Sequence, residues 1–347
     1  MFDTEAFSAH ESVHTFYDEA TGLRALIAIH STARGPAAGG CRMWNYETGG
    51  QAVRDVLRLS EGMSYKNAVA DLPLGGGKAV IWGDSRTQKS PELFEALGRA
   101  IDSLNGRYWT AEDVGISPDD MRHVRRQTSY VAGLDEGEAA SGDPSPLTAL
   151  GVFLGVQASV ARAFDGAEIQ GKHVAVQGIG HVGGVLCEHL HKAGAELTVT
   201  DVNEEALRRA QEKWGAKIVA PDEIYDVEAD VFSPNALGAI VNDQTLHRLK
   251  CKVIAGSANN QLSNPDMGEK VRQAGILYAP DFVINGGGII NVAAEIAGEY
   301  NRNWVMSKID GLVDTLGSIL DQARSEERPT NKVALELAKA RIRQAAN

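Results

Sequence analysis

Apolar positions in the first third of the chain recur with both strand-like and helix-like spacing. Residues 24–30 (RALIAIH) form a β-like run, whereas residues 50–63 carry apolar side chains at helical intervals. The same patterns predict two more strands and two helix starts: residues 79–82, residues 108–110, Ser90-Pro91 and Ser117-Pro118. This mixture of strands and helices predicts an α/β domain that covers residues 1–135.

A different pattern begins after residues 133–146 (GLDEGEAASGDPSP), which are small, polar and helix-breaking. We expect a hinge at residues 136–146 and a helix from about residue 147 to 164. From His173 the order is strand (HVAVQG), glycine turn, helix, strand (LTVTD) and helix, which is typical of a parallel sheet. Further strands are predicted at residues 231–232, 252–255 and 276–278. Three helices are predicted from about residue 287 to 346.

These elements predict an α/β protein of two domains. The second, at residues 147–324, has the order of a Rossmann-type dinucleotide-binding domain, and a C-terminal helix at residues 325–347 can pack back on the first domain.

Composition narrows the class of protein. The chain has 347 residues, 43% hydrophobic and 23% charged, and a net charge of -12, which favours an ordinary globular protein without a nucleic-acid partner. No stretch approaches the roughly 18 apolar residues of a membrane helix. Residues 1–10 have no apolar run, so no signal peptide is expected. Cys41, Cys187 and Cys251 lie far apart, which indicates neither a disulfide framework nor a metal site and fits a cytoplasmic protein.

Residues 66–78 (KNAVADLPLGGGK) form the most informative segment of the first domain. Lys66 and Lys78 bracket a proline and three consecutive glycines, which can bring backbone close to a small ligand. A lysine beside a second cation can serve as a general base near neutral pH. Leu72 and Ala79 exclude a phosphate-binding P-loop. The segment is therefore either a catalytic lysine on a glycine turn or a surface turn with a solvated lysine.

Residues 178–183 (GIGHVG) complete a G-x-G-x-x-G pattern in the context that a dinucleotide site requires. The pattern follows an apolar strand and opens a helix, and Asp201 ends the next strand. Gly178 makes the tight turn, Gly180 admits the pyrophosphate, and Gly183 permits close helix–strand packing. Asp201 can accept hydrogen bonds from both ribose hydroxyls and would repel a 2′-phosphate. The predicted cofactor is NAD, and the alternative is a glycine turn in a Rossmann-like domain that binds no dinucleotide.

Three ionisable groups of the first domain suit a substrate with a carboxylate and an exchangeable proton: Lys66, Lys78 and Asp113. Asn259 and Asn260 follow a predicted strand, at the edge where ligands bind in open α/β sheets. Asn285 opens a second glycine-rich turn, which is either a close approach to a ligand or a helix cap.

Taken together, these residues resemble the leucine/phenylalanine/valine branch of the amino-acid dehydrogenases, relatives of glutamate dehydrogenase. The resemblance runs over nearly the whole chain and rests on dispersed motifs in the same order: GPAAGGCRMW (35–44), MSYKNAVADLPLGGGK (63–78), RYWTAEDVGI (107–116), SGDPSPLTALGV (141–152), GIGHVG (178–183), TDVN (200–203), FSPNALGAI (232–240), AGSANNQL (255–262) and PDFVINGGGIINVA (280–293).

The resemblance implies reversible, NAD-dependent oxidative deamination of a hydrophobic L-amino acid to a 2-oxo acid and ammonium. It implies that Lys78 assists water attack on the imino carbon, that Asp113 handles protons at the amino group, and that Lys66 and Gly40 bind the substrate carboxylate. It places Asn260 near substrate and nicotinamide. The implied dinucleotide contacts are Gly178, Gly180, His181, Val182, Gly183, Asp201, Asn235, Asn259 and Asn285. The implied cleft lies between the two domains.

Four apolar side chains are expected to select the substrate: Ala38, Ala111, Ile289 and Val292. Relatives that use glutamate have lysine at the position of Ala38 and serine at that of Val292, so glutamate should be a poor substrate here. Leucine-specific relatives have leucine where Ala38 stands, which would enlarge the pocket. Ile289 is larger than the usual valine and opposes that change. We therefore expect a branched-chain substrate, with phenylalanine as the alternative.

Two other functions stay open on the sequence. One is a glutamate or broad-range dehydrogenase, and the other is an NAD-sensing protein without catalysis, against which Lys66, Lys78, Asp113 and Asn260 speak. Gly286 replaces an alanine common in the family, near the nicotinamide. The chain also ends sooner than some relatives, so a homo-oligomer is expected as either a dimer or the family's octamer.

Overall fold

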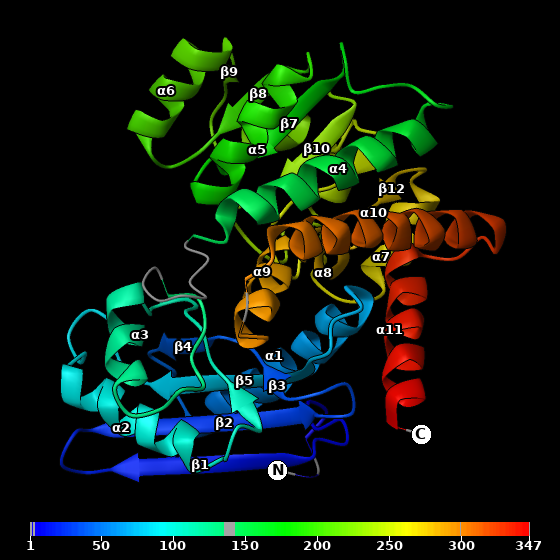
Figure 1. Cartoon of the computed structure of the whole chain (residues 1–347). Coiled ribbons are helices and arrows are strands. Elements are labelled where there is room, and N and C mark those ends of the chain that lie inside the picture. Colours follow the sequence, from blue (N-terminus) through cyan, green and yellow to red (C-terminus); the bar gives the residue numbers. More distant parts are fainter. Residues whose placement is uncertain (1, 3, 135–142, 299, 347) are drawn as a thin grey trace. The chain divides into compact units, whose positions relative to one another are not determined.

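The computed structural model describes residues 2, 4–134, 143–298 and 300–346. They form two compact units. Unit 1 comprises Met1–Asp143, Ile289–Val305 and Ala338–Asn347, and unit 2 comprises Pro144–Gly288 and Met306–Leu337. Each unit is an α/β structure built on its own sheet (Figure 1).

Unit 1 is built on a mixed sheet in the order β1-β2-β5-β3-β6, with β4 also paired to β5. Its described strands are β1 Ser12–Asp18, β2 Leu23–Ser31, β3 Ala37–Ala38, β4 Cys41–Trp44, β5 Gly75–Trp82 and β6 Tyr108–Trp109. β2 is antiparallel to β1 and β5, whereas β3 and β4 run parallel to β5. Strand β5 is therefore bordered by β2, β3 and β4.

Helices bury both faces of this sheet. They are α1 Gly49–Val69, α2 Pro91–Asp102 and α3 Pro118–Arg125. Ser90 and Ser117 cap α2 and α3 as the sequence predicted, because each hydroxyl accepts a hydrogen bond from a backbone N–H in the first turn. In β2, Ile27 packs into the apolar cluster shared with α2 and α3, and Ala28 packs into the cluster shared with α1. The alternation of strand side chains thus builds one core on each side of the sheet.

The prediction of a glycine turn at Gly75–Gly77 is wrong, because these residues lie inside strand β5. All three have buried backbone. An added methyl group at Gly75 would lie 2.0 Å from the carbonyl oxygen of Ser31, and one at Gly77 would lie 2.7 Å from the Tyr108 ring. The glycines are required for close packing against protein, and Lys78 is in a strand rather than in a solvated loop.

Unit 2 is a parallel sheet in the order β12-β11-β10-β7-β8-β9. Its described strands are β7 His173–Gln177, β8 Glu196–Thr200, β9 Lys217–Ile218, β10 Val231–Pro234, β11 Val253–Ile254 and β12 Leu277–Tyr278. The helices that lie wholly in this unit are α4 Ser145–Ala163, α5 His181–Lys192, α6 Glu204–Trp214, α7 Met267–Gln273, α8 Asp281–Ile284 and the 3₁₀ turns η1 Glu223–Asp226 and η2 Leu246–Arg248. The strand order changes direction beside β7, and the glycine-rich loop follows that strand.

Each of the three C-terminal helices has residues in both units, so the units divide the chain at other residues than the predicted domains do. They are α9 Gly287–Ile296, α10 Arg302–Ser325 and α11 Thr330–Ala346. Ile289–Val305, which we placed in the dinucleotide domain, belongs to unit 1, and residues 325–337 belong to unit 2. One reason is a hydrogen bond of 2.6 Å from the Gly133 N–H to Glu295 Oε2, which ties α9 to unit 1. The end of α11 belongs to unit 1 because Arg341 Nη1 donates to the carbonyls of Ala68 and Val69.

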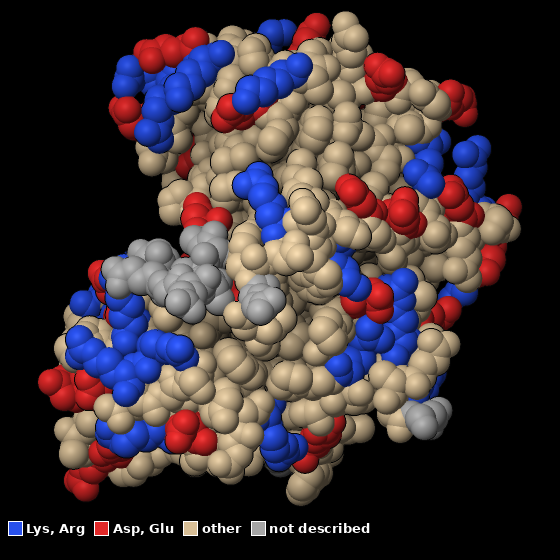
Figure 2. Space-filling model, in the orientation of Figure 1, with Lys and Arg blue, Asp and Glu red and all other residues tan. Residues whose placement is uncertain are grey.

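Two predictions about the chain's segments need comment. The hinge at residues 136–146 lies mostly outside the described residues. Helix α4, with 19 residues and a mean hydropathy of 1.2, is long and apolar enough to cross a membrane by length and composition, contrary to the sequence-based expectation. Its buried Val152, Val156 and Val160 and the contact of Gly155 with Ile284 make it a core helix of unit 2. On the face shown in Figure 2, acidic and basic side chains are interspersed.

Candidate functional site

Helix α1 packs directly on strand β5. The two lysines predicted to bind or convert the substrate, Lys66 and Lys78, therefore lie on two elements that contact each other. Asn67 Nδ2 donates a hydrogen bond of 2.5 Å to the carbonyl of Gly75. A methyl group at Gly76 would lie 2.1 Å from the Ser64 nitrogen, so only glycine permits this contact. Lys66, which is half-buried, is on this helix, and Lys78 is on the strand.

Lys78 and Asp113 form a partly buried ion pair. Lys78 Nζ lies 2.5 Å from Asp113 Oδ2, and the lysine side chain is 7% exposed against 25% for the aspartate. Asp113 follows β6, in a segment fixed to β4 by the hydrogen bond from the Cys41 N–H to the Ala111 carbonyl. The structure therefore brings together the two residues that the resemblance implied to be catalytic.

The charges around Asp113 favour its ionised form. Burial raises the pKa of the Asp113 carboxyl group, but the nearby cations Lys78 and Arg42 lower it, and the result is a pKa below the ordinary value. At neutral pH Asp113 is thus a carboxylate.

Sequence reasoning missed three polar residues beside this pair. Arg42 Nε lies 3.3 Å from Asp113 Oδ2, and Arg42 Nη1 lies 3.1 Å from Asp55 Oδ2. The Tyr46 hydroxyl donates to the same Asp55 oxygen at 2.6 Å. Arg42 is in the segment GPAAGGCRMW, directly after Gly39, Gly40 and Cys41. Its position near a glycine pair is the sequence feature that could have identified it as a site residue.

The predicted carboxylate-binding glycine lies next to Asp113. A methyl group at Gly40 would lie 2.6 Å from the Glu112 carbonyl oxygen and 3.0 Å from Asp113 Cβ, so no side chain fits there. The Gly40 carbonyl accepts a hydrogen bond from the Ala79 N–H at 3.3 Å. Gly40 is thus held one residue from the strand position of Lys78.

The four residues expected to select the substrate lie on elements of unit 1. Ala38 is fully buried in β3, and Ala111, Ile289 and Val292 are half-buried. Gly133 connects two of these elements: its N–H binds Glu295 of α9, and a Cβ placed on it would lie 3.7 Å from Ala111 Cβ.

In unit 2, the loop after β7 has the shape that a dinucleotide phosphate requires. Gly178 has φ +89°, and a methyl group at Gly183 would lie 2.1 Å from the Gly178 carbonyl oxygen. At Gly180, by contrast, an added methyl group would meet no described atom within 4 Å. Gly180 also precedes helix α5, whose first residues are His181 and Val182 and whose N-terminus favours anions. The open space at Gly180 therefore fits a phosphate group.

Asp201 has a structural contact that the sequence did not reveal. Its Oδ2 accepts a hydrogen bond of 2.7 Å from the Ile179 N–H inside the glycine loop, and its Oδ1 accepts one of 2.9 Å from the Asn203 N–H. The carboxylate thus holds the loop and presents its remaining lone pairs at the end of β8.

The predicted amides gather at the carboxyl ends of β10 and β11. Asn235 Oδ1 accepts from the Ser257 N–H at 2.8 Å, and Asn285 Nδ2 donates to the Ser257 carbonyl at 3.0 Å and to Asn259 Oδ1 at 2.8 Å. Within the described structure, the buried Asn285 Oδ1 has no hydrogen-bond partner. Asn260 is exposed, with φ +53°. An unpaired buried acceptor in this cluster suits the donor of a bound ligand.

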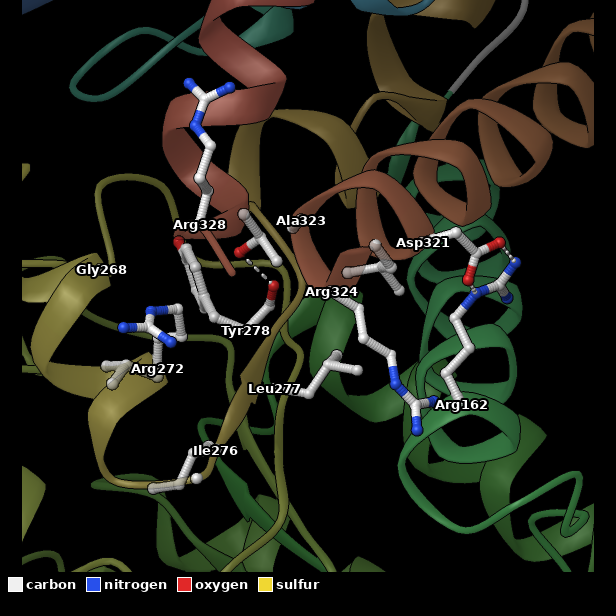
Figure 3. Close-up of a pocket in the computed structure, with 14 residues that line it drawn as sticks. Arg162, Gly268, Arg272, Ile276, Leu277, Tyr278, Asp321, Ala323, Arg324 and Arg328 are labelled. Atoms are coloured by element: carbon white, nitrogen blue, oxygen red, sulfur yellow. Dashed lines mark hydrogen bonds and ion pairs between the residues drawn. The ribbon is translucent and has the colours of Figure 1, made fainter. Parts of the chain in front are cut away.

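A pocket of about 260 Å³ in unit 2 is distinct from these residues. It lies at β12, at the end of the sheet order, and Arg162, Arg272, Arg324 and Arg328 border it (Figure 3). Three of these arginines pair with carboxylates: Arg162 with Asp321, Arg272 with Glu269, and Arg328 with Glu326. Most of its positive charge is neutralised, so it does not provide a strong anion site. No cluster of three metal-ligating side chains occurs among the residues described.

Comparison with known proteins gives the same assignment over nearly the full chain. Residues 7–130 match the family described as Glu/Leu/Phe/Val dehydrogenase, dimerisation domain, and residues 196–346 match Glutamate/Leucine/Phenylalanine/Valine dehydrogenase. The leucine dehydrogenase of Thermoactinomyces intermedius is 50% identical over 342 residues, which are 99% of this chain and 93% of that protein.

Two further relatives act on aromatic amino acids according to their names. The phenylalanine dehydrogenase of Bacillus thermotolerans is 44% identical over 344 residues, 98% of this chain and 90% of that protein. The crystal structure of L-tryptophan dehydrogenase from Nostoc punctiforme superimposes with a TM-score of 0.85 at 41% identity, covering 98% of this chain and 97% of that one. The chain belongs to the glutamate/leucine/phenylalanine/valine dehydrogenase family and is a nucleotide-dependent amino-acid dehydrogenase that acts on small molecules.

Proposed function

We propose that the protein catalyses the NAD-dependent oxidative deamination of a branched-chain L-amino acid, with leucine as the preferred substrate. In this reaction the amino acid, water and NAD⁺ give the 2-oxo acid, ammonium, NADH and a proton. The observation that carries the proposal is the partly buried Lys78–Asp113 pair beside Gly40, within a chain 50% identical to leucine dehydrogenases.

The residues of unit 1 would bind the amino acid and move its protons. Lys66 and the backbone at Gly40 hold the substrate carboxylate. Asp113 accepts a proton from the substrate ammonium group, which prepares the amine for loss of hydride from Cα. Lys78, after it has released its own ammonium proton to solvent, then takes a proton from the water that attacks the imino carbon. Asp113, which lies 2.5 Å from Lys78, returns its proton to the amino group that leaves.

The residues of unit 2 would hold the dinucleotide, which accepts the hydride when bound. The open backbone at Gly180 and the N-terminus of α5 suit the pyrophosphate. Asp201 suits the ribose hydroxyls and opposes a 2′-phosphate, which supports NAD rather than NADP. Asn235, Asn259, Asn260 and Asn285 supply amides on the nicotinamide side.

Substrate preference would follow from the apolar side chains at Ala38, Ala111, Ile289 and Val292. None of them can pair with a γ-carboxylate, so glutamate would bury an uncompensated charge. The small Ala38 keeps phenylalanine as the second candidate, and Ile289 favours the shorter branched chain. Similarity to leucine dehydrogenases at 50% identity, against 44% for a phenylalanine dehydrogenase, supports the same order.

We further propose that the protein is a cytoplasmic homo-oligomer. Cys41, Cys187 and Cys251 are free thiols, and residues 7–130 match a segment described as a dimerisation domain. Strand β1 is at the edge of its sheet, with Tyr17 70% exposed. An exposed edge of this kind suits a subunit contact.

The test is the variant Lys78→Ala, assayed for leucine deamination and for NADH binding. We expect turnover to fall by about 10³-fold or more, since a positioned general base typically contributes 10²–10⁴, while NADH binding is unchanged. Lys89→Ala, at another lysine of unit 1, is the matched control and should retain activity. Near wild-type turnover by Lys78→Ala would contradict the catalytic assignment.

A further inference from the structure

In unit 1, a chain of polar contacts leads from the buried Tyr46 to the Lys78–Asp113 pair. The Tyr46 hydroxyl donates to Asp55 Oδ2 at 2.6 Å, and Arg42 Nη1 contacts the same oxygen at 3.1 Å. From its other edge, Arg42 Nε contacts Asp113 Oδ2 at 3.3 Å. Arg42 therefore bridges two carboxylates, one on helix α1 and one beside the catalytic lysine.

The bridge lies where its charges have a strong effect. The Arg42 side chain is 24% exposed, and those of Asp55 and Asp113 are each 25% exposed, so water screens the contacts only in part. A guanidinium group can donate from Nε and Nη1 in two fixed directions, whereas a lysine ammonium is a single point of charge. The residue type thus matches a two-carboxylate contact.

The backbone fixes both ends of the Arg42–Asp113 contact. Arg42 is in β4, in register with Val80 of β5, two residues beyond Lys78. The segment that carries Asp113 is bound to β4 on both sides, by the Cys41 N–H to the Ala111 carbonyl at 2.8 Å and by the Met43 N–H to the Val114 carbonyl at 2.9 Å. The side-chain contact is therefore held between strand β4 and a loop that is bound to it.

We propose that Arg42 is a positioning residue that fixes the orientation of the Asp113 carboxylate, and that Asp55 and Tyr46 hold Arg42 in place for that task. Lys78 and Arg42 both contact Oδ2, so the rotation of the carboxylate about its last side-chain bond is restricted. The inference rests on the proposed function, because it assigns a purpose to the orientation of a group that moves protons.

The same geometry makes the ionisation of Asp113 depend on Arg42. Several titratable or charged groups surround this carboxylate: Lys78 of β5, Cys41 and Arg42 of β4, Tyr46, Asp55 of α1, Tyr108 of β6 and the neighbouring Glu112. Among them, Lys78 and Arg42 are the cations that lower the pKa of Asp113. Loss of the Arg42 charge should therefore raise that pKa. The acid limb of the pH profile, where kcat/KM falls because Asp113 becomes protonated, should then move to higher pH.

Three variants separate orientation from charge. Arg42→Gln removes both, and we expect kcat to fall by about 10²-fold, the cost typical of misplacing a reacting group by about 1 Å, with the acid limb shifted to higher pH. Arg42→Lys keeps the charge but not the two-point contact, so kcat should fall with a smaller shift of the limb. Tyr46→Phe removes only the hydroxyl that holds Asp55, and its effect should have the same direction and be the smallest.

The matched control is Arg54→Gln, which removes an arginine charge from the same groove. Arg54 lies on α1 beside Asp55, is exposed, and lines the groove of about 630 Å³ that Arg42 and Tyr46 also line. Its kcat and pH profile should equal those of the wild type, and the NADH dissociation constant should be unchanged in all four variants.

The outcomes distinguish this inference from the proposed function. Suppose that the kcat of Arg42→Gln is within about twofold of that of Arg54→Gln, that the acid limb falls at the same pH in both, and that Lys78→Ala is inactive. The positioning role is then wrong, and the proposed function stands. If the wild type does not deaminate any hydrophobic amino acid, the proposed function itself fails. Should Arg42→Gln not fold, Asp55→Asn and Tyr46→Phe decide the matter: a lowered kcat with unchanged NADH binding supports the role, and an unchanged kcat overturns it.

Discussion

Two glycine-rich segments, one in each unit, use the same residue for opposite purposes. In Gly75–Gly77 of β5, every added methyl group would collide with protein atoms, at 2.0 to 2.7 Å. In the loop after β7, an added methyl group at Gly180 would meet no described atom within 4 Å. The first segment is closed by packing, and the second is open to a ligand. Glycine content alone therefore does not identify a binding loop, because what surrounds the glycine decides its purpose.

The largest expected effect comes from the matched pair Gly76→Ala and Gly180→Ala. At Gly76 a methyl group would lie 2.1 Å from the Ser64 backbone nitrogen, so α1 would have to move off β5, and we expect unfolding free energy to fall by about 3 kcal/mol or more. Gly180→Ala should change that free energy by less than about 1 kcal/mol yet weaken NADH binding. Denaturant unfolding and NADH fluorescence titration measure both. If Gly180→Ala lowered the unfolding free energy more than Gly76→Ala, the comparison of the two segments would be contradicted.

Asp201→Ala should sharpen the assignment of the open segment. The carboxylate holds the Ile179 N–H and is expected to bind the ribose hydroxyls, so its removal loosens the loop and removes acceptors. Hydrogen bonds to charged groups contribute about 1.5–3 kcal/mol each, so we expect NAD affinity to fall by roughly 10- to 100-fold with a smaller change in kcat. Binding titrations with NAD and NADP provide the measurement. An unchanged NAD affinity would remove Asp201 from the cofactor site.

The smallest expected effect concerns the packing behind the closed segment. Buried His30 Nδ1 contacts the Oγ of Ser64, the residue that lies against Gly76, at 2.7 Å, and His10 lies beside it. Burial lowers the pKa of both histidines below 6.5, so both are neutral in the folded protein at neutral pH. The unfolded chain binds these protons more tightly, and stability must therefore fall as pH drops below about 6.5.

Substituting one histidine tests that sign. His30→Gln should reduce the slope of unfolding free energy against pH between about 6.5 and 5 by up to about 1.4 kcal/mol per pH unit, the maximum for one proton. The wild type is the reference for this slope. An identical slope in His30→Gln and the wild type would show that His30 does not titrate in this range.

Local patterns predicted unit 2 better than unit 1. Its strands are bounded by turn residues, and its glycine loop obeys a fixed spacing, so that β7, β8, β10, β11 and β12 were all predicted near their observed positions. In unit 1 the pattern did not predict β1, whose residues 12–18 (SVHTFYD) are largely polar, nor the short β3 and β4. It also read Gly75–Gly77 as a turn, because glycine has a low strand propensity and only tertiary packing makes it suitable here.

The candidate site shows the same limit. Lys78 and Asp113 were predicted as separate positions, and the structure places them 2.5 Å apart. The Arg42–Asp55 contact was missed because it joins a strand to the face of a helix, and no periodicity in the sequence records which side chains meet across such elements. Similarly, Asp201 was predicted as a ribose ligand, while its contact with the glycine loop required the folded backbone.

The most direct test of the central claim is a comparison of 2-oxo acids in the presence of NADH and ammonium. We expect kcat/KM to be highest for 4-methyl-2-oxopentanoate, lower for phenylpyruvate, and lower than the first by about 10²-fold or more for 2-oxoglutarate, whose second carboxylate would be buried without a partner. Equal or better use of 2-oxoglutarate would contradict the apolar pocket, and no NADH oxidation with any of the three would contradict the proposed activity.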